Sequence, residues 1–508
     1  MTIGHPIASL KGRSLNMAQP AGLSAGERVA YVKTKIIATV GPATESAEAL
    51  RSLVLAGVDI FRLNFAHGQH DRLAEIVNRI RQISLELRRS VGILGDLSGP
   101  KIRLGEIAGG SLDCVSGARV EFTRQPDVNH PERLASTYES LVDELHVGDA
   151  ILLADGAVTL RVTERIAAEG RIVCEVEQPG SIRSRQGINL PGVSLSTPSL
   201  TDKDRDDLAW ALEQQLDFVG LSFVRSAADI HLLREAIDAH TPASTNPPLI
   251  VAKIEKMEAI SQLEEILDAT DAIMVARGDL GVEVDLALVP GLQKRIIRLC
   301  NEHRIPVITA TQMLESMTEH NRPTRAEATD VANAVLDGSD AVMLSGETAV
   351  GKFPLEAVTA MSRIAREAER LMPTHKALDP QSAERQRALA ITEAVTLGAG
   401  TVAEQLEANL IVVATQGGKT ALAMSRQRNR VPIIGLSENA ATCRRLTLYW
   451  GVTPLNLPAT ERSPEQLLRF IVDWGRKQQI LQTGSRIVLV TGSNWSGAHD
   501  VLQVHTVP

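Results

Sequence analysis

Two stretches decide the fold: PLIVAKIEKMEAI, from Pro248 to Ile260, and DAIMVARGDLG, from Asp271 to Gly281. Each begins with a short run rich in β-branched apolar residues, which is typical of a strand buried on both faces, and each then passes into charged residues. Side chains alternate along a strand, so Lys253 and Glu255 share a face. If the neighbouring strand brings Asp279 beside them, one ammonium group and two carboxylates meet at the end of a sheet.

The two carboxylates predict a bound cation. Glu255 and Asp279 would repel each other at close range unless a positive charge joined them. An all-oxygen pair suits a hard ion such as Mg²⁺ or Mn²⁺, and Lys253 would then face whatever anion the metal holds. The alternative is a structural ion pair between Lys253 and Glu255, and their spacing by itself favours that alternative.

A strand pattern followed by a helix pattern recurs through most of the chain. Three such strands precede residue 99, in TKIIATV, VDIFRLNF and VGILGD, and five follow residue 198, in DFVGLSFV, PLIVAKIE, DAIMVARGD, PVITATQM and DAVMLSGETA. Helix patterns separate them, for example over Ser46–Ala56. Alternating strands and helices indicate a parallel sheet, and eight such units match a (β/α)₈, or TIM, barrel of about 250 residues.

The series of strand–helix units is interrupted once and is followed by another region. Between residues 99 and 198 the chain favours alternating strands and tight turns, with a hairpin signal at Asp155–Gly156, which predicts a small inserted β-barrel. After residue 371, further strand patterns alternate with helix patterns and predict an open α/β sheet. We therefore expect four parts: an N-terminal arm (1–32), the barrel (33–98 and 199–371), the β insertion (99–198) and a C-terminal α/β domain (372–508).

Composition and charge exclude several classes of function. The chain has 508 residues and a net charge of −8, which argues against general nucleic-acid binding. Its cysteines, Cys114, Cys174, Cys300 and Cys443, lack the spacing of a metal site or a disulfide framework and indicate reduced thiols. The N-terminus has no apolar core of signal-peptide length, and no later stretch is apolar enough to span a bilayer. We expect a soluble, cytoplasmic protein that binds neither nucleic acid nor membrane.

Polar residues also end several of the other predicted barrel strands. Arg62 and Asn64 share a face in FRLNF, and Asp96, Thr311 and Ser345 follow the third, seventh and eighth strands. Burying such a set without a ligand is costly, and a (β/α)₈ barrel keeps its active site at the carboxyl ends of its strands. These residues shift the balance from a structural ion pair toward a ligand site.

A second candidate site lies in the C-terminal region. The segment TQGGKT, from Thr415 to Thr420, joins a strand pattern to a helix pattern. It offers backbone amides, hydroxyls and a lysine to a phosphate. It is not a Walker loop, because Val413 stands five positions before Gly418. A plain strand-to-helix turn is an equal alternative for this segment.

After its first 32 residues the sequence closely resembles the pyruvate kinase family. The resemblance is carried, in family order, by KIIATVGPAT, FRLNFAHG, GDLSGPKIR, KIE, MVARGDLGVE, ITATQMLESM, PTRAEATDVANAVLDGSDAVMLSGETA and ATQGGKT. It implies a glycolytic phosphotransferase that moves the phosphoryl group of phosphoenolpyruvate to ADP and releases pyruvate and ATP. The β insertion would be the family's mobile lid, the C-terminal domain its allosteric domain, and the assembly a homotetramer.

The resemblance also implies roles for single residues. Glu255 and Asp279 would hold Mg²⁺ or Mn²⁺, and Lys253 would stabilise the moving phosphoryl group. Thr311, with Ser345 behind it, would relay a proton to the enolate. The substrate contacts would be Arg62, Lys253, Gly278, Asp279 and Thr311, and the nucleotide contacts Asn64, His67 and Arg103, with a second magnesium ion on the nucleotide. The catalytic set is Lys253, Thr311, Ser345 and Arg62.

Some positions depart from the family pattern. Many members bind potassium near the positions of Asn64 and Asp96, with a serine and a glutamate that are Ala66 and Lys101 in this chain. We predict that the Lys101 ammonium replaces the potassium charge and that activity does not require potassium. Gln186 stands where a lysine is often found, so the nucleotide role of that position is not carried over.

The TQGGKT segment resembles the effector loop of bacterial members activated by sugar phosphates, although Gly417 stands where many relatives have serine. Thr415, Gly418, Lys419 and Thr420 are therefore candidate phosphate contacts for a sugar phosphate or nucleotide effector.

Three alternatives stay open at this point. A metal-dependent aldolase or lyase that acts on pyruvate or phosphoenolpyruvate would also use two carboxylates and a cation on a barrel. Lys253 could form a Schiff base, although Glu255 beside it favours a charged lysine. An inactive barrel could serve as a metabolite sensor or scaffold, although the polar strand ends argue against that.

Overall fold

The computed structural model describes residues 32–66, 68–124, 130, 132–193, 195–240, 246–372, 391–458, 463–492 and 500–508. Apart from Val32, the predicted N-terminal arm lies outside these residues, as does His67. Among the described helices, none is long and apolar enough to cross a membrane.

Eight parallel strands form a closed barrel in the order β1-β16-β15-β14-β13-β12-β3-β2. This confirms the predicted (β/α)₈ barrel. The strands are β1 (Lys35–Thr39), β2 (Ile60–Asn64), β3 (Gly92–Asp96), β12 (Phe218–Leu221), β13 (Leu249–Ile254), β14 (Ala272–Ala276), β15 (Val307–Ala310) and β16 (Ala341–Leu344). They are buried almost throughout, which explains their near-continuous apolar sequences.

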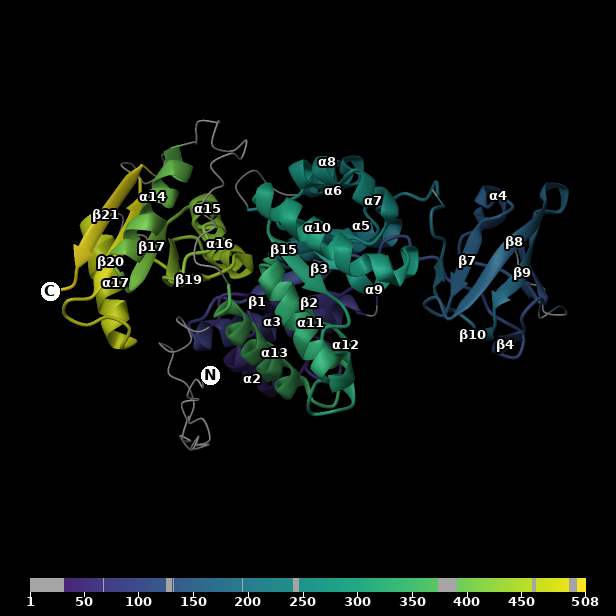
Figure 1. The fold of residues 1–508 in the computed structure, drawn as a ribbon, viewed down its shortest axis with the longest axis horizontal. Coiled ribbons are helices and arrows are strands. Elements are labelled where there is room, and N and C mark those ends of the chain that lie inside the picture. Colours follow the sequence, from purple (N-terminus) through teal and green to yellow (C-terminus); the bar gives the residue numbers. More distant parts are fainter. Residues whose placement is uncertain are drawn as a thin grey trace, which may run out of the picture.

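Helices surround the barrel (Figure 1). The main ones are α2 (Ala47–Ala56), α3 (His70–Glu86), α5 (Asp202–Glu213), α6 (Ala227–His240), α8 (Leu263–Ala269), α10 (Val289–Glu302), α11 (Arg325–Asp337) and α13 (Pro354–Glu369). Further short helices lie in the connections that follow the strands: α7 (Met257–Ser261), α9 (Arg277–Glu283), η2 (Leu286–Leu288), η3 (Glu315–Thr318) and α12 (Gly346–Ala349). The predicted helix over residues 46–56 is α2, and Ser46 caps it by accepting a hydrogen bond from the amide of Ala49.

Between β3 and α5 the chain leaves the barrel and forms the β insertion, which projects from one side of the molecule (Figure 1). Its six-stranded sheet has the order β11-β7-β8-β9-β5-β6, and a two-stranded sheet pairs β10 with β4. The two end strands of this sheet, β11 and β6, do not pair with each other among the described residues, so the insertion is a partial barrel. The predicted hairpin joins β7 to β8, with positive φ angles at Ala154, Asp155 and Gly156.

The elements of the insertion are β4 (Ser111–Cys114), β5 (Arg119–Thr123), β6 (Arg133–Leu134), α4 (Leu141–Glu144), β7 (Ala150–Leu153), β8 (Val158–Ile166), η1 (Ala167–Glu169), β9 (Arg171–Gln178), β10 (Gly180–Arg183) and β11 (Ile188–Asn189).

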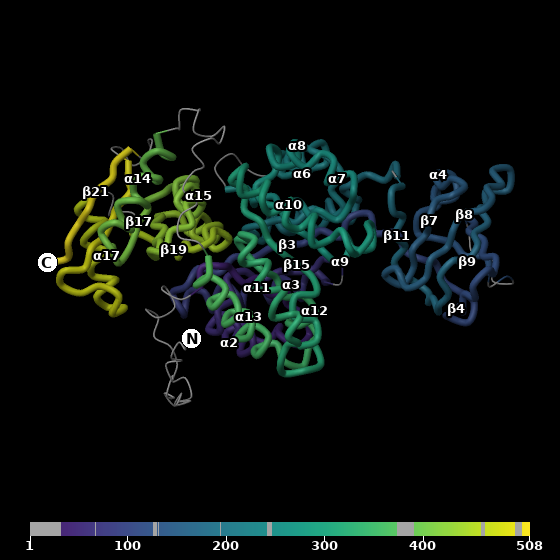
Figure 2. The backbone as a smooth tube through the Cα atoms, viewed as in Figure 1, coloured from purple at the N-terminus to yellow at the C-terminus, as the bar shows by residue number. Residues whose placement is uncertain are grey.

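The C-terminal region is the predicted open α/β sheet and lies at the opposite end of the molecule from the insertion (Figure 2). Its strand order is β19-β18-β17-β20-β21, with β21 antiparallel to β20. Alternate residues of β17 face two separate cores: Ile411 packs with α14 and α15, and Val412 packs with α17. The elements are α14 (Ile391–Gln405), β17 (Leu410–Ala414), α15 (Lys419–Arg426), β18 (Ile433–Ser437), α16 (Ala440–Arg445), η5 (Leu446–Leu448), β19 (Val452–Asn456), α17 (Pro464–Lys477), β20 (Arg486–Thr491) and β21 (Val501–Thr506).

Candidate functional site at the barrel mouth

Lys253 and Glu255 stand at the carboxyl end of β13. Both are buried, and Lys253 Nζ lies 2.9 Å from Glu255 Oε1. The side-chain alternation of the strand explains why they meet, because Ile254 between them faces the outer core. Burial by itself would lower the pKa of Lys253, but the carboxylates of Asp96 and Glu255 outweigh it and raise that pKa above its usual range. Lys253 is therefore a protonated, nearly dry ammonium.

Arg62 and Asp96 add a second ion pair from β2 and β3. Arg62 Nε donates to Asp96 Oδ2 at 2.7 Å, and Arg62 Nη1 donates to Thr39 Oγ1 at 3.1 Å. Asp96 Oδ1 lies 3.5 Å from Lys253 Nζ. Burial opposes ionisation of Asp96, yet Lys253 and Arg62 together hold its pKa below the usual value. Two cationic side chains thus share one carboxylate at the strand ends.

Asp279 reaches this cluster from a helix. It lies in the first turn of α9, three residues after β14 ends, and is only partly buried. Burial raises the pKa of the Glu255 carboxyl against the opposing pull of Lys253, and the charge of Asp279 raises it further. A divalent cation between Glu255 and Asp279 would remove that repulsion.

The donor set fits a hard divalent ion. Glu255 Oε1 and Asp96 Oδ1 are buried oxygens for which the described residues offer no hydrogen-bond donor in good geometry, although Lys253 Nζ is close to both. No group of three His, Cys, Asp or Glu side chains with metal-binding geometry occurs in the described part of the chain. The protein would thus supply two carboxylates, and water or substrate oxygens would complete the coordination shell, as is usual for Mg²⁺.

The turn after β12 supplies two contacts that the sequence did not predict. Ser222 Oγ accepts a hydrogen bond from Lys253 Nζ at 2.8 Å and donates to the carbonyl of Leu97 at 2.7 Å. The amide of Phe223 donates to Glu255 Oε2 at 2.7 Å. The one available signal was a polar residue directly after the apolar run DFVGL, the pattern seen at the other strand ends.

Thr311 is held beside Gly278 by a strained backbone. Its φ is 67°, in the left-handed region that a β-branched residue rarely adopts. Thr311 Oγ1 accepts a hydrogen bond from the amide of Gly278 at 2.7 Å and donates to the carbonyl of Ala310 at 2.6 Å. The guanidinium of Arg277 donates to the carbonyl of Thr311 at 2.8 Å and so supports this conformation.

Ser345 directly follows β16, the barrel neighbour of β15, which Thr311 follows. Its amide donates to Glu347 Oε2 at 2.7 Å, and the other oxygen of this fully buried carboxylate accepts from the amide of Leu314. The structure shows no hydrogen bond between the described side chains of Ser345 and Thr311. The two residues are therefore held at adjacent strand ends by separate contacts.

The predicted nucleotide residues are only partly brought together. Asn64 pairs in register with Asp96, and its Oδ1 accepts from the amide of Ala66 at 3.1 Å. His67 lies outside the described residues. Arg103 belongs to the β insertion, where its guanidinium donates to the carbonyl of Arg185 at 3.2 Å. No contact between Arg103 and the Lys253 cluster is found among the described residues.

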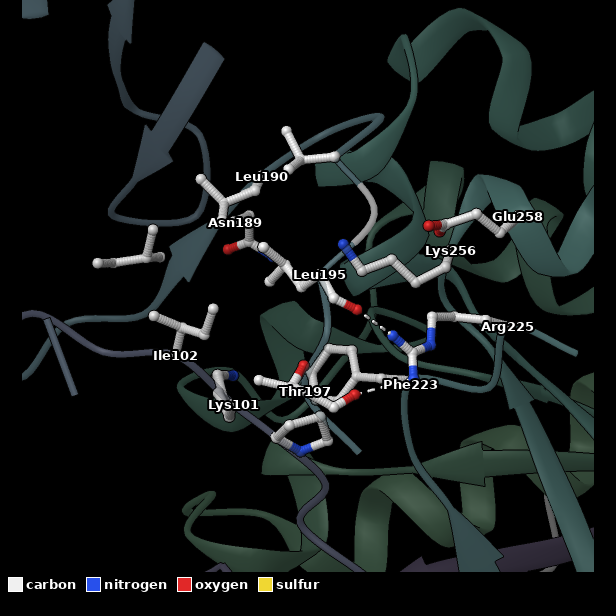
Figure 3. Close-up of a pocket in the computed structure, with 13 residues that line it drawn as sticks. Lys101, Ile102, Asn189, Leu190, Leu195, Thr197, Phe223, Arg225, Lys256 and Glu258 are labelled. Carbon is white, nitrogen blue, oxygen red and sulfur yellow. Dashed lines mark hydrogen bonds between the residues drawn. The ribbon is translucent and has the colours of Figure 1, made fainter. Parts of the chain in front are cut away.

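Lys101 stands where the β insertion joins the barrel. It is exposed and lines a pocket together with Asn189, Leu195, Phe223 and Lys256 (Figure 3). The figure also shows Arg225 donating to the carbonyls of Leu195 and Thr197, which ties the returning chain to the barrel. Two residues of this pocket connect it to the Lys253 cluster: the amide of Phe223 donates to Glu255, and Lys256 follows Glu255 in the chain. No ion pair links Lys101 to Asp96 among the described residues.

The candidate phosphate loop joins β17 to α15. The amide of Gly418, which has a φ of 90°, donates to Thr415 Oγ1 at 3.0 Å. Thr415 and Thr420 are buried, whereas Lys419 is exposed. The far end of α15 contacts the barrel, because Arg426 donates to Asp340 Oδ2 at 3.0 Å.

Comparison with known proteins gives a consistent likeness. The family model for the pyruvate kinase barrel domain matches residues 31–358, and the model for the pyruvate kinase alpha/beta domain matches residues 393–505. A pyruvate kinase of Geobacillus stearothermophilus is 40% identical over 477 residues, which cover 94% of this chain and 80% of the relative. Pyruvate kinase 2 of a Synechocystis strain is 43% identical over 483 residues, covering 94% of this chain and 79% of the relative. The crystal structure of a pyruvate kinase from Cryptosporidium parvum superposes with a TM-score of 0.87 at 35% identity, covering 96% of this chain and 98% of that chain.

Proposed function

This chain belongs to the pyruvate kinase family, and from that premise we propose that it transfers the phosphoryl group of phosphoenolpyruvate to ADP and releases pyruvate and ATP. It is a phosphotransferase. We further propose that it works in the cytoplasm as a glycolytic enzyme and that its residues act as follows. The observation that carries the mechanism is the buried Lys253 ammonium, held beside Glu255 and Asp96 at the mouth of the barrel.

Glu255 and Asp279 would hold Mg²⁺ or Mn²⁺, with oxygens of phosphoenolpyruvate as further ligands. When bound, the ion supplies positive charge that neutralises the substrate anion and orients it for transfer. The amide of Gly278 and the guanidinium of Arg62 would bind the substrate from neighbouring strand ends. To bind the substrate, the Gly278 amide would give up or share its hydrogen bond to Thr311 Oγ1, and Arg62 would give up or share its hydrogen bond to Asp96.

Lys253 would stabilise the transition state of the transfer. The charge of the moving phosphoryl group is spread over its outer oxygens, and a fixed ammonium in a dry site interacts strongly with that charge. The raised pKa of Lys253 keeps it protonated. That same protonation disfavours the Schiff-base alternative, which needs a neutral amine.

Thr311 and Ser345 would serve the second half of the reaction. After transfer the enolate of pyruvate must accept a proton on carbon, and a positioned hydroxyl that relays a proton contributes about 10²- to 10⁴-fold. The strained φ of Thr311 aims its hydroxyl at Gly278, where the proposed substrate site lies. Ser345, at the next strand end, would continue the relay toward water.

ADP would bind where the β insertion faces the barrel. Asn64 and His67 would contribute from the barrel, Arg103 from the insertion, and a second magnesium ion would arrive on the nucleotide. Because Arg103 is held within the insertion in this structure, we propose that the insertion closes as a lid and carries Arg103 toward Lys253. Closure would also exclude water, which competes with ADP for the phosphoryl group.

A coupled assay that follows ATP formed from phosphoenolpyruvate, ADP and Mg²⁺ tests the proposed function. We expect saturable ATP formation that stops when the metal is chelated. Aldol cleavage or condensation of pyruvate without ATP formation would instead support an aldolase or lyase. An absence of all turnover would support a sensor or scaffold.

We predict that activity is independent of potassium. Lys101 follows Asp96 in the same connection and would place its ammonium where relatives hold the ion. The rate in a sodium- and potassium-free assay should change less than about twofold on adding potassium, while Lys101→Glu, which restores the relatives' residue, should become potassium-dependent. A large activation of the wild-type enzyme by potassium would refute this prediction.

We also predict that the loop around Gly418 binds the phosphate of an effector, a sugar phosphate or a nucleotide, through Thr415, Gly418, Lys419 and Thr420. The loop connects to the barrel through α15, whose Arg426 pairs with Asp340 at the base of β16. If a panel of such compounds yields an activator, Lys419→Ala should raise its half-saturating concentration by about tenfold or more, the typical value of a lost hydrogen bond to a charged group. Lys477→Ala, an exposed lysine in the same domain, is the control. Equal activation of all three proteins, or none by any compound, would contradict this prediction.

Two further predictions concern the number of subunits and the domain limits, which we place at residues 98/99, 198/199 and 371/372, after an N-terminal arm of residues 1–32. We propose a homotetramer, which light scattering of the purified protein would test; a monomeric mass at assay concentration would exclude it.

A further inference from the structure

Ser222 occupies a central place among the strand ends. It follows β12 directly, and β12 lies between β3, which ends in Asp96, and β13, which carries Lys253. Its side chain is buried, 3% exposed, and it bonds to groups from both neighbours. The hydroxyl hydrogen is committed to the carbonyl of Leu97, because a carbonyl can only accept. The oxygen lone pair is thereby left facing Lys253 Nζ.

Among the described residues, Ser222 is the one neutral hydrogen-bond partner of Lys253 in this cluster. Its ammonium lies 2.9 Å from Glu255 Oε1 and 3.5 Å from Asp96 Oδ1, but its hydrogen bond in good geometry goes to Ser222 Oγ at 2.8 Å. Carboxylates attract an ammonium from many directions, whereas a hydroxyl with a fixed lone pair specifies one. Without that hydroxyl the ammonium would be drawn between the two carboxylates and away from an incoming phosphate.

We propose that Ser222 is a positioning residue for phosphoryl transfer: its hydroxyl fixes the direction of Lys253 Nζ so that the remaining N–H groups face the phosphoryl oxygens. This inference rests on the proposed function, because it assigns Ser222 a role in phosphoryl transfer. It gives Ser222 no contact with substrate or metal. Ser222 acts through Lys253 alone.

Backbone and packing contacts constrain the turn that carries Ser222. The next residue, Phe223, has a φ of 55°, which is unusual for an aromatic residue, and its amide is tied to Glu255 Oε2. Gly99 packs closely on the same turn. A Cβ at that position would lie 2.9 Å from Phe223 Cδ2 and 3.1 Å from Ser222 Cβ. The turn therefore cannot shift easily, so the Ser222 oxygen is a fixed reference point for the lysine.

The test compares the steady-state kinetics of Ser222→Ala with those of the wild-type enzyme in the coupled assay. Loss of a hydrogen bond to a charged group should lower kcat by about 10- to 100-fold. The KM for phosphoenolpyruvate should change by less than about threefold, because the hydroxyl does not bind substrate. Ser222→Thr, which keeps the hydroxyl, should recover most of the lost kcat.

Ser339→Ala is the matched control. Ser339 is also buried in the same barrel, just before the amino end of β16, and its hydroxyl hydrogen-bonds with Thr309 Oγ1 at 2.7 Å. It should lose stability comparably, measured as the thermal unfolding midpoint, but keep its kcat. The positioning role is overturned by a kcat of Ser222→Ala equal to that of the wild type, by a rise in KM with unchanged kcat, or by an equal loss of kcat in Ser339→Ala. A wild-type enzyme that forms no ATP would instead remove the proposed function and this inference with it.

Discussion

Lys253→Met is expected to lower kcat for ATP formation by about 10³- to 10⁵-fold, the range found when a cationic side chain that stabilises phosphoryl transfer is removed. Methionine keeps most of the volume of the lysine stem but brings no charge to the phosphoryl oxygens. The measurement is the coupled assay at saturating phosphoenolpyruvate, ADP and Mg²⁺. Under these conditions weaker substrate binding does not lower the measured rate, so a lower rate reports a slower chemical step.

Lys256→Met is the control for this experiment. Lys256 lies three residues later and pairs with Glu283 at 2.9 Å rather than with the strand-end cluster. Its kcat should stay within about tenfold of the wild-type value, since it is not expected to touch the phosphoryl group. A Lys253→Met enzyme that stays folded and keeps its turnover would contradict the role given to Lys253.

Loss of the lysine will also cost stability. Glu255 would be left buried without its cation, while Asp96 would keep Arg62 as its partner. Breaking a buried ion pair on one side typically costs about 3–5 kcal/mol. The thermal unfolding midpoint in the presence of Mg²⁺ should therefore be measured alongside the kinetics. We expect Lys253→Met to unfold at a lower temperature than the wild type but well above the assay temperature. The variant is then folded during the assay, and its kcat can be compared with that of the wild type.

Glu255→Gln and Asp279→Asn are expected to raise the Mg²⁺ concentration for half-maximal activity by more than about 100-fold, beyond the 10- to 100-fold typical of residues that only support a ligand. Each variant removes one anionic ligand at constant volume. Glutamine at position 255 can still accept the hydrogen bond that the Phe223 amide now donates to Glu255 Oε2. The Glu255→Gln variant should therefore stay folded, and its main defect should be a weaker affinity for Mg²⁺.

Glu283→Gln is the matched control for the metal site. Glu283 is a buried glutamate at the end of α9 that pairs with Lys256 and accepts from the amide of Gly192. Its Mg²⁺ requirement should stay within about threefold of the wild-type value, because it is not a proposed ligand. An equal shift in all three variants would show that buried charge in general, rather than coordination, sets the metal requirement.

Much of the architecture could be predicted because it follows from strong local patterns. Buried parallel strands need continuous apolar runs, and eight such runs with helix patterns between them leave few topologies other than a closed barrel. The period of two along β13 likewise put Lys253 and Glu255 on one face, and their charged atoms lie 2.9 Å apart. The sequence patterns for the partial closure of the β insertion and for the edge strand β21 were weaker. Pairing between distant segments decides both.

The details of the site that escaped prediction depend on tertiary contacts. Asp279 approaches Glu255 from the first turn of α9 rather than from the end of β14. The positive φ values of Phe223 and Thr311 have no sequence signature, since neither residue prefers that conformation. Ser222 looked like any polar residue after a strand, and only the closed strand order placed it between Asp96 and Lys253.

The central claim is that Glu255 and Asp279 share a divalent cation, with Lys253 facing the substrate phosphate. Its most direct test is a crystal structure with Mn²⁺ and phosphoenolpyruvate, in which anomalous scattering identifies the metal. We expect an anomalous peak about 2.0–2.3 Å from one oxygen of each carboxylate, with Lys253 Nζ against a phosphoryl oxygen. A peak elsewhere, or a substrate phosphate turned away from Lys253, would contradict it.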